Sequence, residues 1–245
     1  MQEILKTINI TKTYGEKQVL SNINIHLGEG ELVGILGVSG VGKTTLFNVL
    51  SGLSIPDSGS VFLEGEDITG KTGCLSYMLQ KDMLLPHKKM IDNVALPLVI
   101  KGMKSKEANE MALQHFREFG LEGTEDKYPA MLSGGMRQRA AFLRTYLCGN
   151  KVALLDEPFS ALDTITRASV WEWYLDVMKK IRLSTFFITH DIDEAILLSD
   201  RIYILKGSPG CIKEEIAIDK EGIAEDEFML SDSFLNYKRD IRALL

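Results

Sequence analysis

Gly37-Val38-Ser39-Gly40-Val41-Gly42-Lys43-Thr44-Thr45, residues 37–45, decides the fold. It matches the phosphate-loop pattern, in which glycines lead into a lysine and a hydroxyl residue, and it follows an apolar segment and opens a helical one. Glycines let backbone N–H groups curl around phosphate oxygens, and the helix start adds positive potential. A plain glycine turn would not require the lysine or the hydroxyl. We therefore predict a nucleotide-phosphate loop, with Lys43 reaching the β and γ phosphates and Thr44 ligating Mg²⁺.

A second apolar run, Val152-Ala153-Leu154-Leu155, ends in two acids, Asp156 and Glu157. A strand buried on both faces that ends in an acid can hold the water shell of Mg²⁺, so Asp156 is a candidate metal ligand. Glu157 can accept a proton from an attacking water or orient it. Such a strand end is common by itself, but beside a phosphate loop it predicts the second half of a nucleotide site.

The surrounding segments predict an α/β fold. From residue 152 onward strands alternate with helices, which indicates a mostly parallel sheet covered by helices. The architecture we expect is a mostly parallel central sheet, an antiparallel β region near the N-terminus and an inserted helical subdomain. The predicted strands are 4–11, 18–27, 31–36, 60–63, 74–79, 152–155, 185–188 and 201–205, and the predicted helices are 42–50, 105–119, 164–181, 192–198 and 231–245.

We expect a single domain over residues 1–245. Segments 1–85 and 149–216 form its nucleotide-binding core, 86–148 is the inserted helical subdomain, and 217–245 is a C-terminal extension that ends in a helix. We expect that helix to pack on the body, and binding of a regulatory partner is the alternative.

The composition indicates a globular protein and gives no sign of nucleic-acid binding or of a membrane-spanning segment. The chain has 245 residues, 45% of them hydrophobic and 25% charged, with a net charge of -6, which is a globular balance. No lysine-arginine block suggests nucleic-acid binding. The apolar run 94–100 is far shorter than the roughly 20 residues that cross a bilayer, and the N-terminus shows no secretion signal, so any membrane link must run through a partner. Three scattered cysteines, Cys74, Cys148 and Cys211, are expected to be free thiols in a reducing compartment.

The segment Leu132-Ser133-Gly134-Gly135-Met136-Arg137-Gln138-Arg139 is another glycine-containing helix start. Ser133 can cap the helix or bind a phosphate, and an ordinary capped helix would explain the segment alone. The segment resembles the signature of ABC transporter ATPases, however, and other family motifs follow the family order over residues 3–216. These are Tyr14 at the adenine-stacking position, the Q-loop Gln80, the D-loop Ser160-Ala161-Leu162-Asp163, and the switch histidine His190 in Ile188-Thr189-His190-Asp191.

This resemblance implies a phosphate-loop NTPase in which two subunits pack head to tail around two ATP. It implies Lys43, Glu157 and His190 as catalytic residues, and Thr44, Gln80 and Asp156 as ligands of Mg²⁺. The partner's Ser133, Gly134 and Gly135 would cap each ATP, with Asp163 in the D-loop nearby. The residues implied to bind ATP within one chain are Tyr14, Val19, Gly37, Val38, Ser39, Gly40, Val41, Gly42, Lys43, Thr44, Thr45 and Gln80.

The implied partners are a second copy or a closely related ATPase, an integral membrane permease and an extracytoplasmic substrate-binding protein, with no nucleic acid. The implied location is the cytoplasm, peripheral on the inner face of the cell membrane. Segments 84–86, 92–96, 133–139, 157–160 and 189–195 resemble the importer branch for nitrate, sulfonates, taurine, bicarbonate and thiamine-pyrimidine precursors. The solute itself would contact other subunits, so this chain does not name it.

Two other classes of phosphate-loop protein are alternatives to a transport ATPase. A non-transport ABC ATPase of DNA repair would carry coiled-coil or zinc insertions, and one of translation would fuse two ATPase halves, whereas this sequence has one motif set and no such insertion. An unrelated phosphate-loop GTPase would need an Asn-Lys-x-Asp segment to read guanine, and none occurs. Transport is therefore the favoured function.

Overall fold

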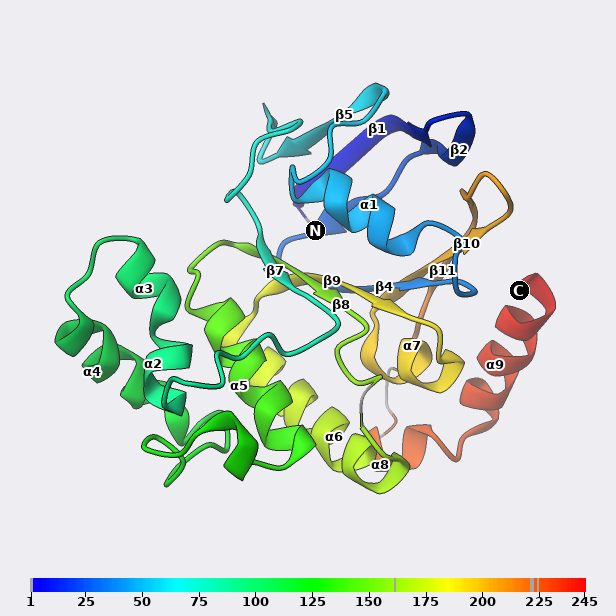
Figure 1. Cartoon of the computed structure of the whole chain (residues 1–245). Coiled ribbons are helices and arrows are strands. Elements are labelled where there is room, and N and C mark those ends of the chain that lie inside the picture. Colours follow the sequence, from blue (N-terminus) through cyan, green and yellow to red (C-terminus); the bar gives the residue numbers. More distant parts are fainter. Residues whose placement is uncertain (1, 161, 221–222, 224) are drawn as a thin grey trace.

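The computed structural model describes residues 2–160, 162–220, 223 and 225–245. Two sheets form the body, and helix α1 lies between the antiparallel sheet and the central sheet (Figure 1). Helices α5, α6 and α7 cover the opposite face of the central sheet, and helices α2 to α4 project to one side. The α/β class, the mostly parallel central sheet and the helical insertion predicted from the sequence are confirmed.

The first sheet is antiparallel and belongs to the N-terminal part. Its strands run in the order β2-β1-β5-β6, and β3 pairs with the other end of β1. The bounds are β1 (Glu3–Tyr14), β2 (Lys17–Ile23), β3 (His26–Gly28), β5 (Ser58–Leu63) and β6 (Glu66–Asp67).

The single strand predicted over 18–27 is wrong, because the chain breaks between β2 and β3. Asn22 adopts a positive φ of 51°, which bends the strand. The hydroxyl of Thr7 bridges the break by donating to the carbonyl of Ile23 at 3.1 Å and accepting from the N–H of Ile25 at 3.0 Å. Buried backbone groups at the break thus keep partners.

The central sheet positions the site. Its order is β11-β10-β4-β9-β8-β7, and all neighbours are parallel except β10 and β11. The bounds are β4 (Leu32–Leu36), β7 (Ser76–Met78), β8 (Val152–Asp156), β9 (Ser184–Thr189), β10 (Arg201–Lys206) and β11 (Cys211–Ala217). Every residue of β4, β8 and β9 is buried, as in parallel sheets covered on both faces.

Helices complete the fold. Helix α1 carries the glycine loop at its start, α2 to α5 lie between β7 and β8 in sequence, and α9 packs against α7. The bounds are α1 (Lys43–Leu50), α2 (Met90–Val94), α3 (Leu96–Ile100), α4 (Ser105–Phe116), the 3₁₀ turn η1 (Pro129–Met131), α5 (Gly134–Tyr146), α6 (Thr164–Ile181), α7 (Ile192–Leu198), α8 (Glu225–Phe228) and α9 (Asp232–Leu244).

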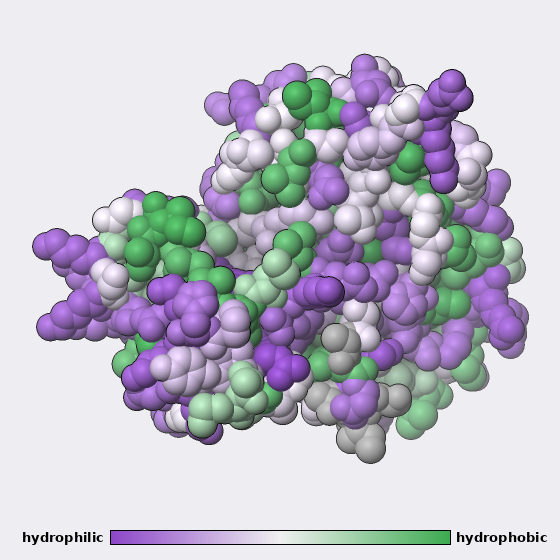
Figure 2. Space-filling view, in the orientation of Figure 1, coloured by the Kyte–Doolittle hydropathy of each residue, from purple (hydrophilic) through white to green (hydrophobic). Residues whose placement is uncertain are grey.

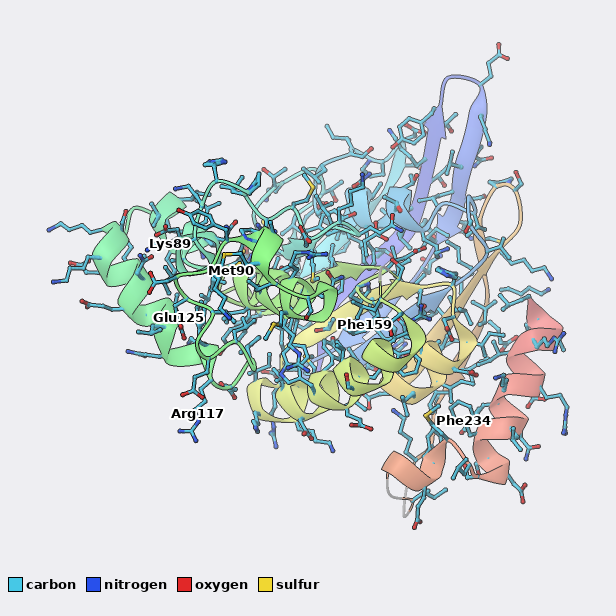
Figure 3. All side chains as sticks on the ribbon, turned by 60° about the horizontal axis from the view of Figure 1, so that its bottom comes forward. Lys89, Met90, Arg117, Glu125, Phe159 and Phe234 are labelled. Carbon is cyan, nitrogen blue, oxygen red and sulfur yellow. The ribbon has the colours of Figure 1, made fainter. Side chains whose placement is uncertain are left out.

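The helical part is fastened around α2. The N–H groups of Met90 and Ile91 donate to the carbonyls of Lys127 and Glu125 at 2.8 and 3.0 Å, and Figure 3 shows Lys89, Met90 and Glu125 close together. The 124–127 segment therefore caps the start of α2, where no side chain does so.

Two hydrophobic clusters sandwich the central sheet. Val33 and Ile35 point to the cluster around α1, whereas Leu32 and Leu36 point to the cluster beneath α5, α6 and α7. This alternation along β4 is the period-two pattern of a strand, with both faces apolar. Among the described residues, no helix is both long and apolar enough to cross a membrane.

Candidate nucleotide site

The glycine loop takes a conformation that side chains would prevent. Gly40 and Gly42 have φ values of 82° and 111°. A Cβ on Gly37 would lie 2.4 Å from the carbonyl oxygen of Leu205, so that position tolerates only glycine. No side chain caps α1, which leaves the N–H groups of its first turn available for an anion.

Lys43 lies inside this loop and is only 6% exposed. Its Nζ donates to the carbonyls of Gly37 at 2.7 Å and Val38 at 3.1 Å. Burial lowers the pKa of Lys43, while the carboxylates of Glu157 and Asp156 oppose that shift. The ammonium is thus held at the loop, beside the two acids at the end of β8, Asp156 and Glu157.

Asp156, the last residue of β8, faces the start of α1. Its Oδ2 accepts hydrogen bonds from the Thr44 hydroxyl at 3.1 Å and from the Tyr77 hydroxyl at 3.4 Å. Burial raises the pKa of Asp156, and the two hydroxyls and Lys43 partly oppose this. Burial also raises the pKa of Tyr77, so its hydroxyl stays a donor. Tyr77 was not predicted, because an aromatic residue inside a strand gives no signal of a polar role.

Glu157 occupies a strained turn immediately after β8. Its φ is 46°, which is uncommon for a residue with a side chain, and its N–H donates to the carbonyl of Ile188 at 3.1 Å. Its Oε2 accepts from Nε2 of Gln80 at 3.1 Å and lies 3.3 Å from Nδ1 of His190. The segments after β7, β8 and β9 therefore meet at one carboxylate oxygen.

These groups surround a hollow of about 360 Å³. It joins residues from the N-terminal sheet, the glycine loop and the ends of two central strands. Its lining residues are Val19, Ser39, Gly40, Gly42, Lys43, Thr44, Thr45, Gln80 and Glu157. All nine were predicted from the sequence as site residues, and the size and polarity suit a phosphate chain. Asp156 and His190 are not lining residues, but each contacts one: Asp156 contacts Thr44, and His190 contacts Glu157.

Tyr14 lies outside the residues that line the hollow. Its side chain is half-exposed, its hydroxyl is 3.4 Å from the Ser54 hydroxyl, and the Lys12 ammonium lies 5.3 Å from its ring centroid. Val41, also predicted, is a buried residue of the loop itself. The stacking role of Tyr14 stays a prediction.

The signature residues do not line the hollow. Ser133 is exposed and caps α5, because its Oγ accepts the N–H of Met136 at 3.3 Å. Gly135 is buried, and a Cβ on Gly134 would lie 3.5 Å from the Leu162 side chain. Asp163 is exposed, and Ala161 of the predicted D-loop lies outside the described residues.

Contacts that the sequence did not predict tie helix α5 to the site. The Gln138 side chain donates to the carbonyl of Pro158, next to Glu157. Nε of Arg137 lies 3.2 Å from Oδ2 of Asp82, two residues beyond Gln80. These polar pairings join residues that are far apart in the sequence, so no spacing rule signals them.

Comparisons with known proteins agree with this geometry. The ABC transporter family model matches residues 20–160. The formylaminopyrimidine import ATP-binding protein of Halalkalibacterium halodurans is 40% identical over 100% of this chain and 97% of its own length. The nitrate import ATP-binding protein of Synechocystis is 35% identical over 94% of this chain and 89% of its own length. The predicted resemblance to that importer branch is confirmed.

Solved structures show the same fold. A dimeric ATP-binding cassette in a post-hydrolysis state, bound to ADP and Pi, has a TM-score of 0.76 at 30% identity and covers 88% of this chain and 99% of that one. The family of this chain follows from three findings. These are a glycine loop that can hold phosphates, two acids at the end of β8, and the similarity to these relatives. The chain belongs to the ABC transporter family, as one of its ATP-binding, ATP-hydrolysing members.

Proposed function

We propose that this chain is the ATPase subunit of an importer, that it dimerises around two ATP, and that it drives a small solute through a separate membrane permease. The observation that carries the proposal is the separation of two glycine-containing helix starts. The hollow contains the start of α1, whereas the exposed start of α5 at Ser133 contributes nothing to it. The import ATP-binding relatives support the direction of transport.

The dimer follows from that separation. A triphosphate held by the glycine loop of one subunit leaves an open side, and Ser133 with Gly134 and Gly135 of the other subunit is a suitable cap. Ser133 is exposed, and a helix start offers N–H donors and positive potential. The dimeric state of the similar cassette with ADP and Pi supports this arrangement. Asp163, in the segment that runs toward α6, is proposed to lie at the same contact between subunits.

The proposed chemistry uses three side chains around the hollow. Lys43 neutralises charge on the β and γ phosphates. Glu157 accepts the proton of the attacking water, since among the described residues no hydrogen bond reaches its Oε1. We propose that His190, which is half-exposed and contacts Glu157, donates to the γ phosphate. Catalysis of phosphoryl transfer is mostly positioning and charge stabilisation, which these groups supply.

The polar groups at the end of β8 fit Mg²⁺. The hydroxyl of Thr44, the carboxylate of Asp156 and the amide oxygen of Gln80 are oxygen donors, and Mg²⁺ prefers few protein ligands with waters and phosphates. When bound, the ion would withdraw charge from the phosphates.

The remaining ATP contacts come from the rim. Val19 lines the hollow, and the half-exposed ring of Tyr14 lies next to the ammonium of Lys12. An exposed aromatic ring can stack on adenine, so we propose that Tyr14 and Val19 hold the base.

A second hollow of about 420 Å³ suits the permease. It lies between the Gln80 segment and α3, and its lining includes Met83, Leu96, Pro97 and Ile100. Met83 is 56% exposed and Ile100 is 76% exposed, and apolar surface gathers where α3 lies in Figure 2. Apolar side chains at a hollow of this size are typical of protein contacts, so we propose that a cytoplasmic segment of the permease packs here.

Contacts around this hollow connect it to the ATP site. Nη1 of Arg144 donates to the carbonyl of Met83 at 2.9 Å, and Asp82 pairs with Arg137 near the start of α5. Movement of Gln80 with the nucleotide would thus shift both the permease contact and the signature. We propose that residues 86–148 form the helical subdomain and that 1–85 with 149–216 form the core. In the assembled system the whole chain would lie against the inner face of the membrane, and an extracytoplasmic substrate-binding protein would complete it.

A pull-down from membranes tests the proposal. The tagged wild-type chain is expected to capture a multi-span permease, and Ile100→Glu is expected to lose that capture while it still binds ATP. Leu230→Glu is the matched control, because Leu230 is 86% exposed and far from the hollow in sequence. Capture of ribosomes or DNA-repair factors in place of a permease would favour the non-transport ATPase.

A further inference from the structure

Arg167 lies in the first turn of α6 and contacts two loops at once. Its Nη1 lies 3.2 Å from Oδ2 of Asp191, and its Nη2 donates to the carbonyl of Leu162 at 3.0 Å. Its side chain is 25% exposed. The two acceptors flank functional positions, because Asp191 follows His190 and Leu162 precedes Asp163.

Asp191 is fixed by more than this ion pair. Its Oδ1 accepts the N–H groups of Asp193 at 2.9 Å and Glu194 at 3.2 Å, which caps α7. Its own N–H donates to the Thr189 hydroxyl at 3.0 Å. One carboxylate oxygen therefore holds the helix and the other holds Arg167, so the backbone that carries His190 has little freedom beside this anchor.

Leu162 connects the same arginine to the signature. Its side chain is 6% exposed, and it is the nearest side chain to the position that a Cβ on Gly134 would occupy, at 3.5 Å. The Leu162 side chain therefore borders the start of α5, where a shift of the Leu162 backbone would be felt. Packed interiors transmit such shifts because few voids absorb them.

We infer that Arg167 is a positioning residue that couples His190, at the chain's own ATP, to Gly134, at the signature proposed to cap the partner's ATP. The guanidinium suits this role because its planar fork holds two acceptors in fixed directions, which a lysine ammonium does not. The inference rests on the proposed function, since it gives His190 and the signature the roles assigned there. It adds a path within one subunit between its two nucleotide contacts.

The test measures the ATP dependence of turnover in Arg167→Met and Arg167→Lys. We expect nucleotide affinity within about twofold of wild type, turnover lower by about tenfold or more, and a Hill coefficient for ATP that falls toward one. Lysine is not expected to restore the coefficient. Arg117→Met, at an exposed arginine labelled in Figure 3, is the control and should change none of these.

Asp191→Asn breaks the same ion pair from the other side and keeps the test decisive if an Arg167 variant fails to fold. Its effect on the Hill coefficient should match that of Arg167→Met, and the double variant should be no worse than either single one. A coefficient unchanged in folded Arg167→Met or in Asp191→Asn overturns the inference. His190→Ala separates the two claims, because full turnover in that variant overturns the proposed role of His190 itself.

Discussion

Nδ1 of His190 lies 3.3 Å from Oε2 of Glu157, and both residues follow directly on strands that are neighbours in the central sheet. Gln80 reaches the same oxygen from beyond β7 at 3.1 Å. Parallel strands deliver their C-terminal ends to one edge, so three separate segments fix one carboxylate beside the glycine loop.

Glu157→Gln is expected to lower ATP turnover by about 10²- to 10⁴-fold, which is the usual contribution of a positioned general base. ATP binding should stay near wild type, because the loop and Lys43 hold the phosphates. Steady-state hydrolysis and direct binding of labelled ATP measure the two effects. Glu122→Gln, at an exposed residue, is the control, and near-normal hydrolysis by Glu157→Gln would remove Glu157 from its assigned role.

Ser133→Arg is expected to block ATP-driven dimerisation. Ser133 is exposed at the start of α5, so the variant should fold with an undisturbed core. The arginine side chain would fill the place proposed for the partner's phosphates. Sedimentation with ATP should show only single subunits, with ATP binding to each subunit retained. An unchanged dimer signal contradicts the proposed cap.

Glu194→Gln is expected to flatten the dependence of stability on pH. Burial raises the pKa of Glu194 to about 8 from 4.5, with Asp191 adding to the shift and Arg167 opposing it. Between these two values the folded chain holds a proton that the unfolded chain releases, so this group makes wild type less stable as pH rises, by at most about 1.4 kcal/mol per pH unit.

Chemical denaturation of both proteins at pH 5, 6, 7 and 8 measures this difference. The free energy of unfolding of Glu194→Gln minus that of wild type should increase as pH rises, and this difference should become constant above about pH 8. Curves that stay parallel over this range would show that Glu194 is ionised in the folded chain.

Phe234→Ala is expected to detach α9 from the body, at a cost of about 3–5 kcal/mol in the free energy of unfolding of that segment. Phe234 is 3% exposed, and its ring lies 5.6 Å from that of Phe228; Figure 3 shows it at the base of α9. Leu235→Ala is the control because Leu235 is 51% exposed. Hydrogen exchange of 232–244 should rise in the first variant only, and equal exchange would contradict tight packing.

The sequence predicted the parts of the fold that local chemistry determines. Three segments have a local sequence pattern that fits one type of secondary structure. They are the loop over 37–45, the buried run before Asp156 and the helix over 192–198. The nine residues that line the first hollow were all predicted. The loop residues and Glu157 follow from their own patterns, whereas Val19 and Gln80 were implied by the resemblance to ABC transporter ATPases.

Features set by distant partners could not be predicted. Strand β11 has five exposed residues and three charges, so it shows no buried pattern, and it forms because β10 offers it an edge. The break after β2 depends on the hydroxyl of Thr7 in another strand. Tyr77 near Asp156 and Arg137 near Asp82 meet only after the chain has folded.

The most direct test of two ATP held between facing subunits is a cross-link between Ser39→Cys in one chain and Ser133→Cys in another. Both positions are exposed, and the native Cys74, Cys148 and Cys211 are replaced by serine. Mixing the two single variants in the Glu157→Gln background with ATP, Mg²⁺ and a short thiol cross-linker should give a covalent heterodimer, and omitting ATP should abolish it. Absence of that product with ATP, while the same cysteine variants with Glu157 restored hydrolyse ATP at the full rate, would contradict the account.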